Sequence, residues 1–102
     1  MDKGPKTKDN GSMVVSKHIV YHGRVQGVGF RYVASQTAAE FEVSGYVRNL
    51  ANGGVELVAE GTKDEVEAYL ASISRRMAAY IEDTTVKDET LTGYSGFKIR
   101  YG

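Results

Sequence analysis

The stretch HIVYHGRVQGVGFRYVASQTAAEF, residues 18–41, passes from one kind of periodicity to another and decides the fold class of this chain. Its first part, from His18 to Arg24, has an apolar centre and predicts a β-strand. Three glycines between positions 23 and 29 predict a loop. Apolar and small side chains then recur at steps of three and four residues, which predicts an amphipathic helix. The residues on its buried face are Phe30, Val33, Ala34, Thr37, Ala38 and Phe41.

The residues that follow predict a hairpin and a second helix. Two apolar stretches, Ser44–Leu50 and Val55–Glu60, read as strands, and the turn residues Ala-Asn-Gly-Gly between them favour a β-hairpin. Thr62 and Glu65 then have the spacing of a capping box, which marks the start of a helix. One apolar stripe follows at helical spacing, consisting of Val66, Tyr69, Leu70, Ile73 and Met77.

The C-terminal part predicts two further strands, one over 81–87 and one in which Phe97, Ile99 and Tyr101 alternate with Lys98 and Arg100. The order strand–helix–strand–strand–helix–strand indicates an α+β, ferredoxin-like βαββαβ sandwich. We expect an antiparallel sheet with two helices on one face, formed by a single domain over residues 13–102. Residues 1–12 are polar, resemble a tag remnant, and are predicted to be flexible and outside the core.

The composition narrows the class of function. The chain has no cysteine and only two histidines, His18 and His22, so thiolate chemistry is excluded and a metal centre is not expected. The two histidines alternate on one side of a strand and are predicted to be structural or exposed. Net charge is zero, with 13 basic and 13 acidic residues, and no apolar run has the length of a membrane span. We expect a monomeric cytoplasmic protein without a cofactor and without a nucleic-acid or membrane partner.

The distribution of charge points to a local anion site. From Asn10 to Ala39 the chain has no Asp or Glu but contains Lys17, Arg24 and Arg31. A second acid-free stretch, residues 43–55, contains Arg48. Basic residues without acids around them create a local field that attracts an anion. Arg24 and Arg48 either add to this attraction or are solvated strand residues, and the second interpretation is the simpler.

The glycine loop, residues 23–31 (GRVQGVGFR), has the features of a phosphate-binding turn. A loop that connects a strand to a helix has free amides at the positive helix end, and glycines let several amides converge on one group of oxygens. Arg31 at the helix start can bind two oxygens of the same phosphate. The loop lacks the Gly-Lys-Ser/Thr of a nucleotide P-loop, and Tyr32 occupies the third glycine position of the dinucleotide motif.

This loop resembles the signature of the acylphosphatase family, including its final Phe-Arg pair. The segment GYVRN, residues 45–49, is similar to the family's second motif, and the closing GFKI, residues 96–99, continues the similarity. The resemblance extends from about Lys17 to Tyr101. The chain departs from the family pattern at residues 76–79, Arg-Met-Ala-Ala, where the family often has Gly-Pro, so the resemblance does not predict the conformation of that connection.

The resemblance implies an enzyme that hydrolyses the carboxyl–phosphate bond of acyl phosphates without a metal. It implies that Arg31 binds the phosphate and that Asn49 orients the attacking water. The amides that hold the phosphate would belong to Gln26, Gly27, Val28, Gly29, Phe30 and Arg31. It also implies direct attack of water, with the proton taken by a phosphate oxygen of the substrate and no phosphoenzyme.

Two other classes of function are consistent with a ferredoxin-like fold. An RNA-binding module would carry aromatic residues in its central strand, but residues 55–60, VELVAE, have none and include two acids. An anion-binding or accessory domain, similar to the acylphosphatase-like domain of carbamoyl-transfer proteins, is the other alternative. Those proteins continue into cysteine-rich segments, which this sequence lacks. We therefore favour the enzyme, with a small-molecule acyl phosphate as its substrate.

Overall fold

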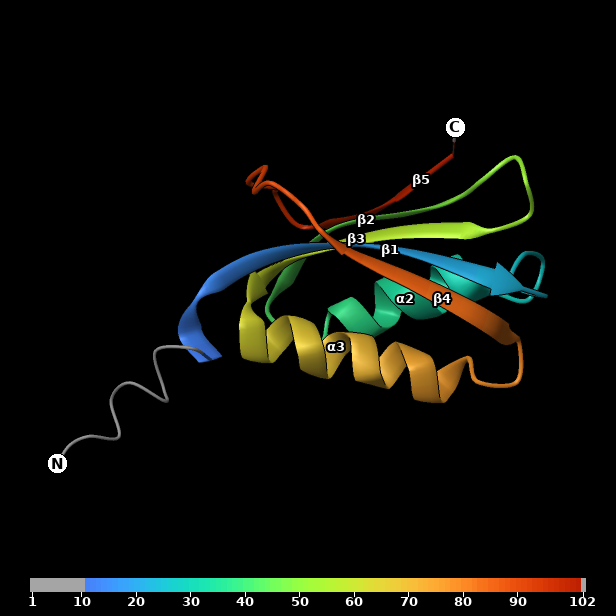
Figure 1. Ribbon diagram of the computed structural model, residues 1–102, viewed down its shortest axis with the longest axis horizontal. Coiled ribbons are helices and arrows are strands. Elements are labelled where there is room, and N and C mark those ends of the chain that lie inside the picture. The colour runs from blue at the N-terminus through green and yellow to red at the C-terminus, as the bar shows by residue number, and fades with distance from the viewer. Residues whose placement is uncertain (1–10, 102) are drawn as a thin grey trace, which may run out of the picture.

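The computed structural model describes residues 11–101, where a five-stranded sheet packs on one side against two helices (Figure 1). This arrangement confirms the predicted α+β, ferredoxin-like class. Of the segment predicted to lie outside the domain, residues 1–10 are not among the described residues. In the described part of the chain, neither helix has the length and apolar character needed to cross a membrane. The elements are β1 Val14–Gly23, α2 Phe30–Ala38, β2 Val43–Asn49, β3 Val55–Thr62, α3 Lys63–Arg76, β4 Ile81–Asp88 and β5 Phe97–Arg100.

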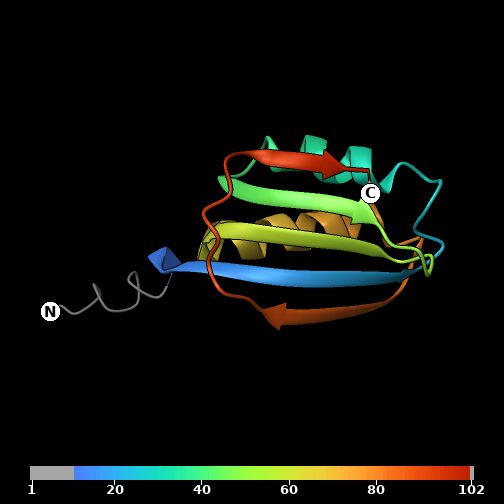
Figure 2. The ribbon, with the colours of Figure 1, turned by 90° about the horizontal axis from the view of Figure 1, so that it is seen from above.

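The strands lie in the order β4-β1-β3-β2-β5, with β4 and β5 at opposite edges (Figure 2). Three of the four pairings are antiparallel, whereas β2 and β5 are parallel, with Val47 opposite Ile99. The prediction of a wholly antiparallel sheet is therefore wrong for the last strand. The first four strands with the two helices complete the βαββαβ unit. The chain then crosses the end of the sheet where β4 finishes, so β5 must run in the direction of β1 and β2.

Strand β1 is longer than the sequence predicts. It begins at Val14 instead of His18 because β3 continues to Thr62, and the two strands pair from Val14 opposite Thr62 to Tyr21 opposite Val55. The first four residues of β1, VVSK, lack an alternating apolar pattern, so only the pairing reveals this part of the strand.

The core lies between the sheet and the two helices. Ile19 and Tyr21 of β1 and Leu57 of β3 face inward and are at most 1% exposed. The ring of Phe30, the first residue of α2, lies 4.8 Å from the ring of Tyr21, which attaches the start of the helix to β1. The buried hydroxyl of Tyr69 on α3 donates a hydrogen bond of 2.8 Å to the carbonyl oxygen of Ala34 on α2. These contacts hold the glycine loop between two fixed elements.

The predicted start of α3 is confirmed, with a change in its capping contacts. Thr62 Oγ1 accepts a hydrogen bond of 3.3 Å from the backbone N–H of Glu65, as expected of an N-cap. The carboxylate of Glu65 accepts a hydrogen bond of 2.7 Å from the backbone N–H of Glu42. The side chain expected to complete a capping box therefore connects α3 to the residue before β2.

The connection after α3, which the family pattern did not predict, is a hydrogen-bonded turn. The backbone N–H groups of Tyr80 and Ile81 both donate to the carbonyl oxygen of Met77, at 2.9 and 3.2 Å, and the Met77 side chain is buried. The Tyr80 carbonyl accepts a hydrogen bond of 3.0 Å from the backbone N–H of Arg24. This turn thus supports the beginning of the glycine loop.

Candidate active site

The glycine loop leaves β1 and turns into α2 through two left-handed residues, Gly27 with φ 76° and Gly29 with φ 82°. A Cβ added at either position would have no neighbour within 4 Å, so the backbone conformation, and not crowding, requires glycine. Gly29 is the N-cap of α2 and provides no side-chain cap, and the first turn of the helix contains no acid. The positive end of α2 is thus not neutralised within its own first turn.

The loop forms one wall of a cavity of about 240 Å³. Asn49, at the end of β2, and Tyr101, after β5, contribute to other walls. The complete lining consists of Val25, Gly27, Gly29, Phe30, Arg31, Tyr32, Asn49, Ile99 and Tyr101. A neighbouring cavity of about 200 Å³ is lined by Arg31, Asn49, Arg100 and Tyr101. The structure therefore brings the two residues predicted to be catalytic, Arg31 and Asn49, to the same two cavities.

Gln26 and Val28 are not among the residues that line either cavity, although both belong to the set predicted to bind substrate. The side-chain amide of Gln26 donates two hydrogen bonds, at 2.7 Å to the Leu50 carbonyl and at 2.8 Å to the Gly54 carbonyl. These carbonyls lie at the two ends of the β2–β3 turn. Gln26 therefore connects the glycine loop to the hairpin that carries Asn49, and this contact has no signal in the sequence.

Asn49 is the last residue of β2 and pairs with Val55 of β3. Alternation along the strand places its side chain on the same face as Val47, which is fully buried on the helix side. The intervening Arg48 points to the other face, where it forms an ion pair with Glu56. The two neighbours in the chain thus serve different faces of the sheet, and only Asn49 lies beside the glycine loop.

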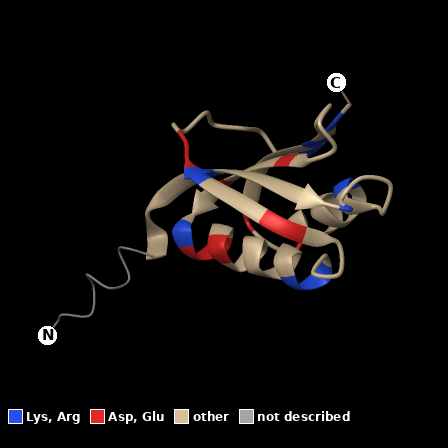
Figure 3. Cartoon of the chain, turned by 45° about the vertical axis from the view of Figure 1, so that its right-hand side comes forward, with Lys and Arg blue, Asp and Glu red and all other residues tan. Residues whose placement is uncertain are grey.

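Arg31 is half-buried, and its guanidinium carbon lies 4.9 Å from the centre of the Tyr101 ring. Within residues 11–101, no acidic side chain forms an ion pair with it. The glycine loop and α2 carry basic segments and no acidic one (Figure 3). A cation that contacts an aromatic ring, and that no carboxylate of the described residues neutralises, remains available for an anion.

The residues from β5 and beyond, Ile99, Arg100 and Tyr101, are the part of the site that sequence reasoning missed. Their alternation predicted a strand and assigned these residues no role in the site. In the structure Tyr101 is 79% exposed and lies against Arg31. The alternating pattern identifies the strand but not its partner. The parallel pairing of β5 with β2 decides which side chains reach Asn49.

The face of the sheet away from the helices holds a polar cluster centred on the buried carboxylate of Glu56. Its oxygens accept hydrogen bonds from His18 Nε2 at 2.7 Å and from the Tyr46 hydroxyl at 3.2 Å, and Arg48 completes the set. Burial by itself would raise the pKa of the Glu56 carboxyl, but hydrogen bonds from the three donors outweigh it and leave the pKa lowered. His18 has the structural role predicted for it, and Arg48 is paired instead of solvated.

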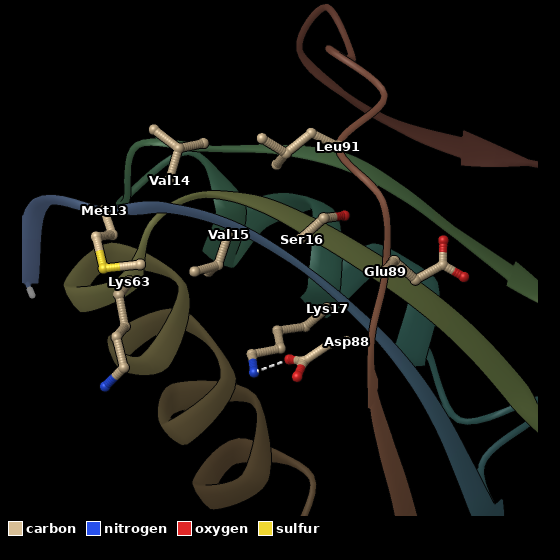
Figure 4. A pocket seen from close by; sticks show the side chains of 9 residues that line it. All are labelled: Met13, Val14, Val15, Ser16, Lys17, Lys63, Asp88, Glu89 and Leu91. Atoms are coloured by element: carbon tan, nitrogen blue, oxygen red, sulfur yellow. Dashed lines mark hydrogen bonds and ion pairs between the residues drawn. The ribbon is translucent and has the colours of Figure 1, made fainter.

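A larger cavity, about 420 Å³, lies at the far end of β1 and contains none of the predicted site residues (Figure 4). Two of its charged side chains, Lys17 and Asp88, form an ion pair on the helix side, while Val14 and Leu91 point away from α3. Within residues 11–101, no group of three or more His, Cys, Asp or Glu side chains is placed to hold a metal ion. The cavities beside Arg31 are thus the ones that combine the predicted residues.

Comparison with known proteins agrees with this arrangement. Residues 17–99 match the acylphosphatase family. An acylphosphatase from Methanospirillum hungatei is 42% identical over 91 residues, which cover 87% of this chain and 93% of the relative. The crystal structure of acylphosphatase from Bacillus subtilis has a TM-score of 0.78 and 30% identity, covering 87% of this chain and 100% of the other. The structure of T. kodakarensis HypF has a TM-score of 0.76 and 31% identity over 88% of this chain but 12% of its own. The chain therefore belongs to the acylphosphatase family.

Proposed function

We propose that this protein hydrolyses acyl phosphates to a carboxylate and inorganic phosphate, with Arg31 and Asn49 as its catalytic residues. The observation that carries the proposal is the presence of both side chains on one cavity, beside an uncapped helix start and two left-handed glycines. Family membership and relatives named acylphosphatase support the activity. The roles proposed for the individual residues are those that the family resemblance implies, and the geometry of the site is compatible with them.

The phosphoryl group would lie between the glycine loop and Arg31. Backbone N–H groups from residues 26–31 and the guanidinium supply donors for the oxygens that carry charge in the transition state. The Tyr101 ring, whose centre lies 4.9 Å from the guanidinium carbon, would hold Arg31 in place while its N–H groups bind the phosphoryl oxygens. The donors therefore require little rearrangement when charge develops on the phosphoryl group.

The leaving group explains why the site contains no general acid. An acyl phosphate is a mixed anhydride, and the carboxylic acid it releases has a pKa of about 4. The carboxylate therefore departs with the bonding electrons without needing a proton at neutral pH. The acid-free sequence from position 10 to 39 fits this requirement, because a carboxylate beside the loop would repel the dianionic substrate.

Asn49 would orient the water that attacks phosphorus. Its side-chain carbonyl oxygen accepts a hydrogen bond from the water, while its side-chain NH2 group donates a hydrogen bond elsewhere. These contacts fix the orientation of the water, so that its lone pair points toward phosphorus. The new bond forms between the water oxygen and phosphorus, and the bond between phosphorus and the acyl oxygen breaks. A phosphoryl oxygen of the substrate takes the proton of the water. No protein group needs to change its protonation state in this sequence.

Hydrolysis of benzoyl phosphate by the purified protein tests the proposal, because the reaction can be followed by ultraviolet absorbance. We expect turnover in the presence of a strong chelator, since Arg31 and the amides provide the positive charge. Failure of the folded protein to hydrolyse benzoyl phosphate would contradict the assignment. A monomeric state and a cytoplasmic location remain predictions from the sequence and do not affect this test.

A further inference from the structure

Arg100 lies at the boundary between the catalytic cavities and the face of the sheet away from the helices. It lines the cavity of about 200 Å³ together with Arg31 and Asn49. It also lines a third cavity, of about 180 Å³, on the outer face with Tyr46 and Tyr94. Arg100 is thus the one residue shared by these two cavities within the described chain.

The guanidinium of Arg100 is held by aromatic rings. Its central carbon lies 3.8 Å from the centre of the Tyr46 ring and 6.0 Å from that of Tyr94. The two rings lie edge to face, with 5.7 Å between their centres. Stacking uses the flat face of a guanidinium and leaves the N–H edge free to donate two parallel hydrogen bonds. Arg100 is therefore pre-organised as a donor for a planar or tetrahedral anion.

The loop that carries Tyr94 is itself fixed in place. The buried carboxylate of Glu60 accepts hydrogen bonds from the backbone N–H groups of Thr92 and Gly93, at 2.6 and 2.9 Å. A longer contact of 3.4 Å reaches the N–H of Tyr94. The ring of Tyr46 is fixed by the hydrogen bond that its hydroxyl donates to Glu56. The two rings that contact Arg100 are thus held in place by hydrogen bonds to the buried carboxylates of Glu56 and Glu60.

The neighbouring arginine, Arg48, differs from Arg100 in its ion pairing. Arg48 lies opposite Arg100 in the parallel register of β2 and β5, and the two side chains lie on the same face. Arg48 is paired with Glu56, whereas no acidic side chain within residues 11–101 forms an ion pair with Arg100. Arg31 and Arg100 are therefore the two guanidiniums with ring contacts that line the same cavity.

We infer that Arg100 is a second anion contact that recognises a carboxylate or phosphate on the acyl part of the substrate. This inference rests on the proposed function, because it assumes that Arg31 and the glycine loop hold the phosphoryl group. The acyl group of the bound substrate would then extend from the catalytic cavity past Arg100 toward the outer face of the sheet. Acyl phosphates that carry a second negative charge are consequently the preferred class of substrate.

Matched aromatic substrates test this preference. Benzoyl phosphate is compared with 3-carboxybenzoyl and 4-carboxybenzoyl phosphate, which add one carboxylate at two different reaches and are too rigid to cyclise. The quantity measured is the ratio of kcat/KM for each carboxylated substrate to kcat/KM for benzoyl phosphate. We expect Arg100→Ala to lower this ratio about fivefold for at least one of the two carboxylated substrates. A change of this size is the upper end of the effect measured for ion pairs at exposed sites.

Lys98→Ala is the matched control. Lys98 is an exposed cation on the same strand and face, and it lines the outer cavity but not the catalytic ones. We expect its removal to leave the ratio unchanged. An equal fall of the ratio in both variants would mean that any nearby positive charge attracts the carboxylate, and this would overturn the inference. An unchanged ratio in Arg100→Ala would overturn it too. If the parent hydrolyses benzoyl phosphate while these ratios stay unchanged, only this inference fails and the proposed function stands.

Discussion

The side-chain amide of Gln26 donates a hydrogen bond of 2.7 Å to the carbonyl oxygen of Leu50, the residue that follows Asn49. A second hydrogen bond from the same amide reaches Gly54 at the other end of the turn. One side chain thus connects the glycine loop, which leads into Arg31, to the strand end that carries Asn49. Gln26 is a positioning residue in the proposed mechanism.

We expect Gln26→Ala to lower kcat for benzoyl phosphate by roughly ten- to a hundredfold, because small displacements of positioned groups have effects of this size. Phosphate binding should change less, since Arg31 stays on α2. The turn itself should survive, because the Leu50 and Gly54 carbonyls each keep a backbone partner, Gly53 N–H and Leu50 N–H respectively. Gln36→Ala, an exposed change on α2, is the control. Equal losses in kcat and phosphate affinity would argue against a positioning role.

Arg31→Ala should weaken phosphate binding and lower kcat/KM by a factor on the order of 10³, because a phosphoryl-binding guanidinium acts in both the ground and the transition state. Arg31→Lys should restore little, since an ammonium cannot make the same two-oxygen contact. The measurements are kcat/KM for benzoyl phosphate and the dissociation constant of phosphate, on variants whose folding is checked by circular dichroism. Unchanged phosphate affinity in Arg31→Ala would show that the anion binds elsewhere.

Asn49→Ala should have a different kinetic signature. We expect kcat to fall on the order of 10²–10³, the effect of removing one pre-positioned polar group. The affinity for phosphate should stay nearly unchanged, because Asn49 is proposed to contact water and not the phosphoryl group. Steady-state kinetics together with calorimetric phosphate binding make the distinction. A variant with near-parental kcat would refute the water-orienting role.

Inorganic phosphate and sulfate should compete with the substrate, because the site is proposed to recognise a tetrahedral anion through Arg31 and the loop amides. Added phosphate is expected to raise KM for benzoyl phosphate and to leave kcat unchanged. Initial rates at several fixed phosphate concentrations provide the test. Inhibition that acts on kcat alone would place the anion outside the cavity that holds the substrate.

Glu56 should make the stability of the fold depend on pH in the acid range. Its hydrogen bonds hold the carboxyl pKa in the folded state below the ordinary value of 4.5, so this group binds fewer protons in the folded than in the unfolded chain. The resulting stabilisation is present above pH 4.5 and is lost as the pH falls toward the folded pKa. Urea unfolding of the parent and of Glu56→Gln should therefore show a stability difference that shrinks below this pH. A difference independent of pH would contradict the role of the carboxylate charge.

The sequence by itself determined the glycine loop and the order of the main elements, whereas the pair Arg31 and Asn49 was a prediction from the resemblance to the acylphosphatase family. The loop and the element order depend on local chemistry: strands and helices have their own apolar periods, and a left-handed turn requires glycine. The resemblance then linked two motifs that are separated in the chain. None of these patterns specifies which strand edge another strand will join.

Only the tertiary structure decided the rest of the site. Strand β5 pairs with β2 because the chain returns across the end of the sheet, and this pairing brings Arg100 and Tyr101 to the cavity of Arg31. Likewise, the two hydrogen bonds of Gln26 exist only once the loop and the hairpin lie side by side. The sequence around a residue is the same whether its side chain packs in the core, faces solvent or lines the active site. Its function depends on which distant segments the packing places next to it.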